Sequence, residues 1–231
     1  MTPAYDHALI VGAGPGLSAS LARLFHAKGL NVSLAARDPG DLEALARETG
    51  ATTHRCDAAD HASVEALFAG LDHPAPPDVL VYNPSARVRG PLTELDPAAV
   101  RAAVQVTAVG AFYAAQQAAR RMIPANHGAI LLTGASAGVK GYAESASFAM
   151  GKFALRGLAQ SMARELHPLG IHIGHFVIDG GIRNPGRSED PNRPDSMLDP
   201  DAIARSYWHF LEQDRSAWAW EIELRPWVET F

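Results

Sequence analysis

Residues 7–18 read His7-Ala-Leu-Ile-Val-Gly-Ala-Gly-Pro-Gly-Leu-Ser18, which has the form of a strand, a glycine turn and the start of a helix. Residues 8–11 are a short apolar run, typical of a buried strand. Leucines then recur at helical spacing up to Gly29, a suitable residue to end a helix. Because the turn and the helix N-terminus both present unpaired N–H groups, the stretch predicts an anion site, usually occupied by a dinucleotide pyrophosphate.

The glycine spacing in this turn allows two interpretations. The dinucleotide fingerprint G-x-G-x-x-G requires a glycine where this chain has Leu17. The chain instead carries Gly12 and Gly16 in a G-x-x-x-G arrangement, with Ser18 beyond them. An ordinary glycine-rich turn between a strand and a helix looks the same, so the turn alone does not decide between the two.

Composition limits the class of protein. The 231 residues carry a formal net charge of −5 without a basic stripe, which argues against a nucleic-acid partner. The single cysteine, Cys56, excludes an internal disulfide and favours a reducing compartment. No apolar run approaches the roughly 18 residues of a membrane span, and the first predicted strand leaves no room for a signal peptide. We therefore expect a cytoplasmic protein with no membrane partner.

Strands and helices are predicted to alternate along the chain. Apolar runs predict strands at residues 8–11, 31–36, 52–56, 78–82, 129–133, 171–177 and 219–224. Helical spacing and capping residues predict helices at 17–28, 42–48, 60–70, 96–122, 147–167 and 200–213, and residues 179–199 are expected to form a loop. This alternation predicts an α/β fold, a doubly wound parallel sheet of about seven strands with helices on both faces. No repeat or linker divides the chain, so residues 1–231 are expected to form a single domain.

Motifs beyond the glycine turn follow in a recognisable order. They include Asp57 after the third strand, Asn83 after the fourth, Lys152 in Phe148-Ala-Met-Gly-Lys152, and the turn Asp179-Gly-Gly-Ile182. In order and spacing, the chain resembles the short-chain dehydrogenase/reductase family over residues 7–225. The resemblance implies that Asp57 contacts adenine, that Lys152 holds the nicotinamide ribose, and that the 179–182 turn closes over the nicotinamide. The residues expected to contact the cofactor are Gly12, Gly14, Pro15, Gly16, Leu17, Arg37, Asp57, Asn83, Ser85, Lys152, Gly180 and Ile182.

The residues after the second strand predict the choice of cofactor. NAD-specific sites place a carboxylate there for the ribose 2′-OH, whereas this chain has Ala36 followed by Arg37. A guanidinium donates in a fork to a phosphate, so the pair favours NADP(H). The alternatives are that Arg37 is merely solvated and that Asp38 turns toward the ribose.

The positions that carry catalysis in the family are altered in this chain. By the resemblance, the tyrosine position is Phe148, the serine position is Ala135 and the asparagine position is Thr107, while Lys152 is retained. Neither Phe nor Ala supplies a proton or an oxyanion donor, so the family's usual carbonyl reduction is expected to be absent or much weakened. Other hydroxyl groups are candidates for the acid.

The candidates for a replacement acid are Tyr142 and Ser136. Tyr142 lies in the loop before the Phe148 helix and is the better candidate, although a tyrosine that only packs the loop is an open alternative. Ser136 is adjacent to Ala135, but one step along a strand turns a side chain to the other face. With Lys152, these two complete the expected catalytic group.

Two patterns suggest other chemistry and are set aside. Gly134-Ala-Ser-Ala-Gly138 spells the G-x-S-x-G of α/β-hydrolases, but the residues that follow have little helical pattern. His172 and His175 resemble a metal pair, yet residues three apart on a strand point to opposite faces. We expect neither a hydrolase nor a metal site.

Two functional classes remain open. The first is an NADP(H)-dependent oxidoreductase with an altered catalytic site and a small-molecule substrate. The second is a catalytically inactive NADP(H)-binding sensor or scaffold. Arginines in the 179–199 loop, Arg183, Arg187 and Arg193, could bind an anionic substrate or could simply be solvated. Small residues in helices 98–122 and 147–167 suggest a homodimer or homotetramer, or only close packing on the chain's own sheet.

Overall fold

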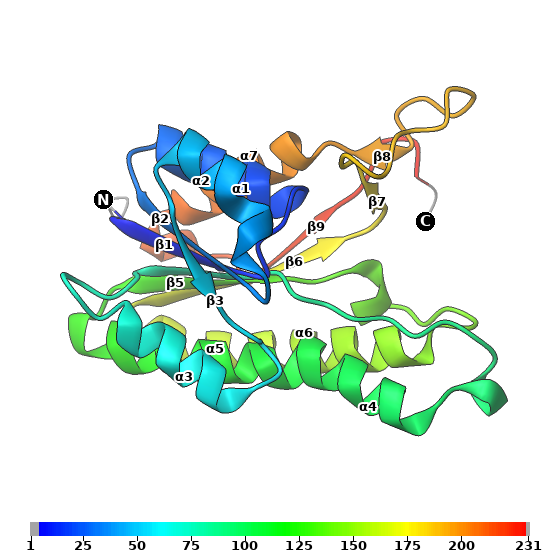
Figure 1. Ribbon diagram of the computed structural model, residues 1–231, viewed down its shortest axis with the longest axis horizontal. Coiled ribbons are helices and arrows are strands. Elements are labelled where there is room, and N and C mark those ends of the chain that lie inside the picture. The colour runs from blue at the N-terminus through cyan, green and yellow to red at the C-terminus, as the bar shows by residue number, and fades with distance from the viewer. Residues whose placement is uncertain (1–4, 230–231) are drawn as a thin grey trace.

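Seven parallel strands form the centre of the structure, a computed structural model that describes residues 5–229 (Figure 1). Their bounds are β1 His7–Val11, β2 Asn31–Ala36, β3 Thr52–Arg55, β4 Val79–Tyr82, β5 Gly128–Thr133, β6 Ile171–Ile178 and β9 Glu221–Leu224. The order across the sheet is β3-β2-β1-β4-β5-β6-β9, and neighbouring strands pair in parallel. From β1 the chain adds β2 and β3 on one side and then β4, β5, β6 and β9 on the other, so the strand order reverses between β1 and β4. Sheets of this kind bind ligands at that point.

Helices cover both faces of the sheet, as the fold class requires. Their bounds are α1 Leu17–Ala27, α2 Glu43–Thr49, α3 His61–Gly70, α4 Pro97–Val104, α5 Gly110–Met122, α6 Ala146–Leu166 and α7 Pro200–Leu211. One face carries α1, α2 and α7, and the other carries α3, α4, α5 and α6 (Figure 1). Within β1, Ile10 belongs to the core on the first side and Leu9 to the core on the second. Both faces are buried, so the strands read as continuous apolar runs.

Local capping explains where several helices begin. The carboxylates of Asp60, Asp96 and Asp199 accept hydrogen bonds from backbone N–H groups in the first turns of α3, α4 and α7. Gly29, just beyond the end of α1, has a φ of +91°, a left-handed value that glycine adopts without strain. The doubly wound parallel sheet predicted from the sequence is confirmed.

The predicted helix over residues 96–122 is interrupted. Gln105–Val109 form a π-helical turn between α4 and α5, with Thr107 fully buried in it. A side chain at Gly110 would overlap the carbonyl oxygen of Ala58, so the close approach of this helix to the β3–α3 connection requires glycine. Single-turn π bulges are frequent at functional sites.

The same helical stretch corrects an expectation about length. By length and apolar composition alone, Pro97–Ala125 could cross a membrane, and it is the one such helix among the described residues. The expectation that no apolar stretch approaches that length was therefore wrong. In the fold, Ala111, Ala114 and Ala118 are completely buried in the core on one side of the sheet, which accounts for the apolar composition.

The expected loop over residues 179–199 also contains structure. Gly181–Ile182 (β7) and Met197–Leu198 (β8) pair in parallel beyond the carboxyl end of β6 (Figure 1). Two-residue strands carry too little periodicity to be predicted from sequence, so the expectation of a structureless loop was wrong. This small pair holds the segment 183–196 beside the carboxyl edge of the main sheet.

Candidate active site

Two neighbouring hollows lie at the carboxyl ends of the strands. One, of about 530 Å³, is lined by the glycine turn and the ends of β2, β3 and β4. The other, of about 740 Å³, is lined by the ends of β5 and β6 and the start of α6. Asn83 and Ser85 line both hollows, so the two form one cleft. Every residue predicted to bind cofactor or to act in catalysis lines one hollow or the other, which places all of them in this cleft.

The glycine turn has the geometry of an anion cradle. Gly12 has a φ of +77°, and a side chain there would overlap the ring of Pro84. Gly16 is the N-cap of α1 and makes no side-chain capping bond, and Gly16 and Leu17 both line the cleft, so the start of α1 is open to an anion there. Ser18 donates to the Gly12 carbonyl at 3.1 Å and accepts from Asn83 Nδ2 at 2.9 Å. Ser18 thus ties the turn to the residue that follows β4.

Arg37 and Asp38 differ in whether their side chains bind other groups of the described protein. Arg37 is exposed in the wall of the 530 Å³ hollow and forms no ion pair within residues 5–229. The carboxylate of Asp38 accepts from Gly40 N at 3.0 Å and caps a short 3₁₀ helix. In the same wall, Asp57 accepts from Ala59 N at 3.0 Å. The guanidinium is therefore available to a ligand, while Asp38 is turned toward its own loop.

Lys152 lies at the other end of the cleft, almost completely buried. Its Nζ donates to the Thr133 carbonyl at 2.7 Å, at the end of β5. Burial lowers the pKa of Lys152 from its ordinary value of 10.5 to about 7. Near neutral pH this amine is therefore able to hold or release a proton.

Two of the three positions where the family resemblance predicts catalytic groups line the hollow that contains Lys152. Phe148 and Ala135 both line the 740 Å³ hollow, and Lys152 Nζ lies 5.8 Å from the centre of the Phe148 ring. Thr107 does not line the cleft; its hydroxyl accepts from Ala86 N at 3.1 Å and supports the loop after β4. The apolar ring of Phe148 therefore lies beside Lys152 at the position where the resemblance predicts a tyrosine.

Tyr142 and Ser136 are brought together in the same hollow. The Tyr142 hydroxyl donates to Ser136 Oγ at 2.9 Å, and Tyr142 is 43% exposed. The expectation that Ser136 points away from the cleft was wrong, because Ser136–Gly138 form a 3₁₀ turn and the strand does not continue past Thr133. This pair supplies hydroxyl groups next to Ala135.

Three basic residues of the cleft were not predicted from the sequence. Arg87 and Arg89 come from the loop after β4, and Lys140 comes from the loop before α6. The guanidinium carbon of Arg87 lies 4.9 Å from the centre of the Phe148 ring. Lys140 Nζ lies 3.5 Å from an oxygen of Asp179. Basic residues four and six positions after Asn83 were a signal in the sequence, but solvated loops carry the same pattern.

The two histidines of β6 lie on opposite sides of the sheet. His172 stacks between Phe210 and Trp218. His175 hydrogen-bonds Glu221 at 3.0 Å, and burial lowers its pKa to about 4. The reason given for rejecting a metal pair, opposite orientation of the side chains, is confirmed.

The hydrolase pattern is not matched by the local structure either. Ser136 begins a three-residue 3₁₀ turn, and the next α-helix starts only at Ala146. A nucleophile elbow needs a helix directly after its serine.

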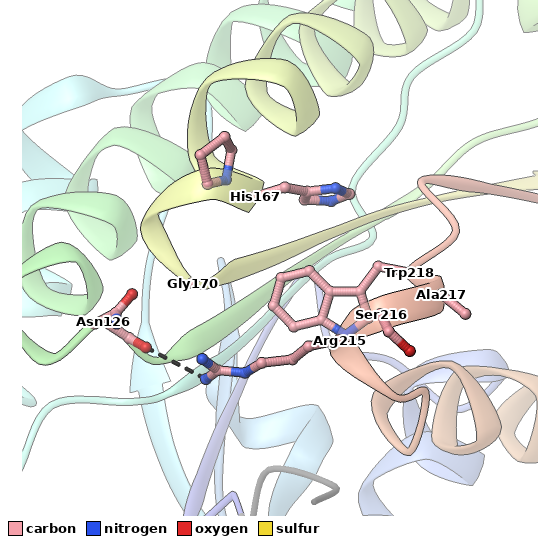
Figure 2. Close-up of a pocket in the computed structure, with 8 residues that line it drawn as sticks. Asn126, His167, Gly170, Arg215, Ser216, Ala217 and Trp218 are labelled. Atoms are coloured by element: carbon pink, nitrogen blue, oxygen red, sulfur yellow. Dashed lines mark hydrogen bonds between the residues drawn. The ribbon is translucent and has the colours of Figure 1, made fainter.

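A further hollow, of about 390 Å³, lies at the amino ends of β5 and β6, away from the cleft (Figure 2). In it, Arg215 donates to the Asn126 carbonyl at 3.4 Å, and His167 meets Trp218 edge to face. Ligands of open α/β sheets bind at the carboxyl ends of the strands, so the cleft is the candidate active site.

Comparison with known proteins agrees with this geometry. Residues 6–188 match the short chain dehydrogenase family, and the chain belongs to this family of oxidoreductases. A cyclic-di-GMP-binding biofilm dispersal mediator protein from Escherichia coli K12 is 32% identical over 71% of this chain and 68% of that protein. A short-chain dehydrogenase structure from Rhodopseudomonas palustris has a TM-score of 0.84 and 32% identity, covering 97% of this chain and 100% of that one. A metagenomic short-chain oxidoreductase in complex with NADP has a TM-score of 0.84 and 27% identity, covering 97% and 98%.

Proposed function

We propose that this protein is an NADP(H)-dependent oxidoreductase that acts on a small molecule through an altered catalytic site. The observation that carries the proposal is a single cleft with the exposed Arg37 at one end and the buried Lys152 at the other. The uncapped start of α1 lies between them and suits a pyrophosphate. The NADP bound by the metagenomic relative supports the same cofactor here.

The chain's own residues divide into binding and chemical groups. Gly12, Gly14, Pro15, Gly16 and Leu17 would hold the pyrophosphate, Arg37 the 2′-phosphate and Asp57 the adenine. Asn83, Ser85, Lys152, Gly180 and Ile182 would surround the nicotinamide ribose and ring. When bound, the reduced cofactor supplies a hydride.

The proton comes from the hydroxyl pair in this proposal. Because Ser136 accepts from Tyr142, the hydrogen of Ser136 stays free for the substrate oxygen. Tyr142 then replenishes that proton from the solvent side, where it is partly exposed. Lys152 positions the ribose and carries a positive charge near the reacting group when protonated.

The test is oxidation of NADPH by the purified protein with carbonyl, imine and enone substrates, together with calorimetric titration of NADPH and NADH. We expect tighter binding of NADPH and turnover with at least one substrate class. Tight NADPH binding without any turnover would support the sensor or scaffold alternative. Absence of binding to either cofactor would contradict both.

A further inference from the structure

The substrate end of the cleft carries more positive charge than its own carboxylates neutralise. Arg87, Arg89 and Arg187 line the 740 Å³ hollow that also holds Phe148 and Lys152. Within residues 5–229, none of these three arginines forms an ion pair. Two carboxylates line the same hollow: Glu229, which is exposed, and Asp179, which is already contacted by Lys140 at 3.5 Å and by Arg225 at 3.4 Å.

Arg87 is held in place by neutral groups. Its Nη2 donates to Ser145 Oγ at 2.5 Å, and its guanidinium stacks over the Phe148 ring. The neighbouring residue Val88 is fixed through both backbone atoms, since the Ser147 hydroxyl accepts from its N–H at 2.9 Å and donates to its carbonyl at 3.0 Å. The guanidinium is therefore ordered before any ligand arrives, which lowers the entropic cost of binding.

The electrostatics around Arg87 are unfavourable for a cation alone. Ser145 is the N-cap of α6, a helix of 21 residues whose N-terminus carries partial positive charge. Desolvation, and then the charge of Arg89, hold the pKa of Arg87 below its ordinary value. A cation in this place is stabilised by an anion that approaches from the cleft.

We propose that Arg87, assisted by Arg89 and Arg187, binds an oxyanion of the substrate, either a carboxylate or a phosphate. The substrate is then a small anionic carbonyl compound or a close analogue. Arg87 stacks on Phe148, and Phe148 lies one helical turn from Lys152. An anionic group bound by Arg87 therefore lies beside the reacting centre. A guanidinium fork matches both oxyanions in geometry. The inference rests on the proposed function, because it assigns the anion to the substrate of the same cleft.

The choice of loop arginine also follows from the structure. Arg183 pairs with Asp199 at 3.4 Å, and Arg193 lies outside the hollow in the exposed part of the 183–196 segment. Of the three loop arginines noted from the sequence, only Arg187 lines the cleft. Arg193 is therefore a matched control.

The experiment measures binding without turnover. Protein saturated with NADP⁺, so that cofactor phosphates are already bound, is titrated calorimetrically with 4-acetylbenzoate, its methyl ester and 4-acetylphenyl phosphate. We expect at least one anionic ketone to bind about 10-fold or more tightly than the ester. The relative affinity of the carboxylate and the phosphate identifies which oxyanion the site prefers.

Two variants test whether Arg87 causes the preference for anionic ketones. We expect Arg87→Gln to remove most of the preference for the anion while NADPH affinity stays unchanged. Arg193→Gln should behave as the parent. If Arg87→Gln does not fold, the inference is tested on the parent alone. Raising the salt concentration from 50 to 500 mM should then reduce the preference for the anionic ketones over the ester.

Two outcomes overturn the inference. One is equal affinity for the ester and both anions in the parent, and the other is a preference that survives Arg87→Gln. Neither outcome would contradict the proposed function, because that function depends on cofactor binding and turnover. Conversely, loss of NADPH binding in the parent would overturn the proposed function, whatever the anion titrations show.

Discussion

The hydroxyl of Tyr142 lies 2.9 Å from Ser136 Oγ, in the hollow that Phe148 and Ala135 also line. Ser136 and Tyr142 lie one and six residues from Ala135 and Phe148, the positions where the family resemblance predicts a serine and a tyrosine. The cleft thus holds a phenol from the loop before α6 and an aliphatic hydroxyl from the 3₁₀ turn after β5.

This relationship predicts the effect of removing the phenol. We expect Tyr142→Phe to lower the turnover of a carbonyl substrate with NADPH by about 10²–10⁴-fold, the usual contribution of general acid catalysis, because Ser136 then lacks the phenol that replenishes its proton. NADPH affinity should not change, because Tyr142 lies at the substrate end. Steady-state kinetics and calorimetry measure the two effects. Tyr113→Phe, on α5 outside the cleft, is the matched control, and full turnover in Tyr142→Phe would assign the tyrosine to loop packing.

The exposed Arg37 predicts cofactor selectivity. We expect Arg37→Ala to weaken NADPH binding about 10- to 100-fold, as the loss of charge-assisted hydrogen bonds implies. NADH binding should change little, because it lacks the 2′-phosphate. Arg55→Ala, at the end of the neighbouring strand β3, is the control that should leave both unchanged. Equal affinities for the two cofactors in the parent would refute the selectivity.

Restoring the family residues should restore family chemistry. Ala135 and Phe148 line the same hollow and Lys152 lies one turn from Phe148, so Ala135→Ser with Phe148→Tyr should raise simple ketone reduction by about 10²-fold or more. Phe148→Tyr alone should give part of the gain. Thr107 limits it, since the family's asparagine is still missing.

Phe153→Tyr, on the exposed surface of α6, is the control for a new phenol elsewhere. The expected gain requires a slow parent. A parent that already reduces simple ketones as fast as the double variant would contradict this prediction, because the Ser136–Tyr142 pair would then replace the family's serine and tyrosine fully.

Buried Lys152 predicts a pH dependence of stability without cofactor. Its pKa of about 7 in the folded chain lies below the ordinary 10.5, so between these values the unfolded chain binds one more proton. The free energy of unfolding should therefore rise with pH, by about 1.4 kcal/mol per unit from this group. Urea unfolding at pH 7.5, 8.5 and 9.5 measures the slope, with Lys152→Met as the reference that lacks it. Parallel curves for the two proteins would contradict the prediction.

Apolar side chains on two helices predict self-association. Phe112 on α5 and Met150 and Phe153 on α6 are 44%, 54% and 44% exposed. We expect a homodimer or homotetramer by light scattering at micromolar concentration, and Phe112→Glu with Phe153→Glu should shift it toward monomer. Leu169→Glu, an exposed apolar residue in the turn after α6, is the control. A monomeric parent would rule this out.

The sequence alone determined the parallel sheet and the position of the cofactor end. Buried strands read as continuous apolar runs, and caps such as Asp60 and Asp96 act within two or three residues, so both signals are local. The glycine turn is local for the same reason: Gly12 and Gly16 act through their own backbone. The interruption at Thr107 was not predictable, because a π turn depends on how that helix packs.

Only the tertiary structure decided the substrate end of the cleft. Arg87 reaches Ser145 across 58 positions of sequence, and Ser136 meets Tyr142 because a 3₁₀ turn redirects the chain after β5. Such contacts depend on the paths of loops, and those paths are set by packing against α6. The neutral partners of Arg87 likewise become visible only in the folded chain, because sequence records its charge but not what surrounds it.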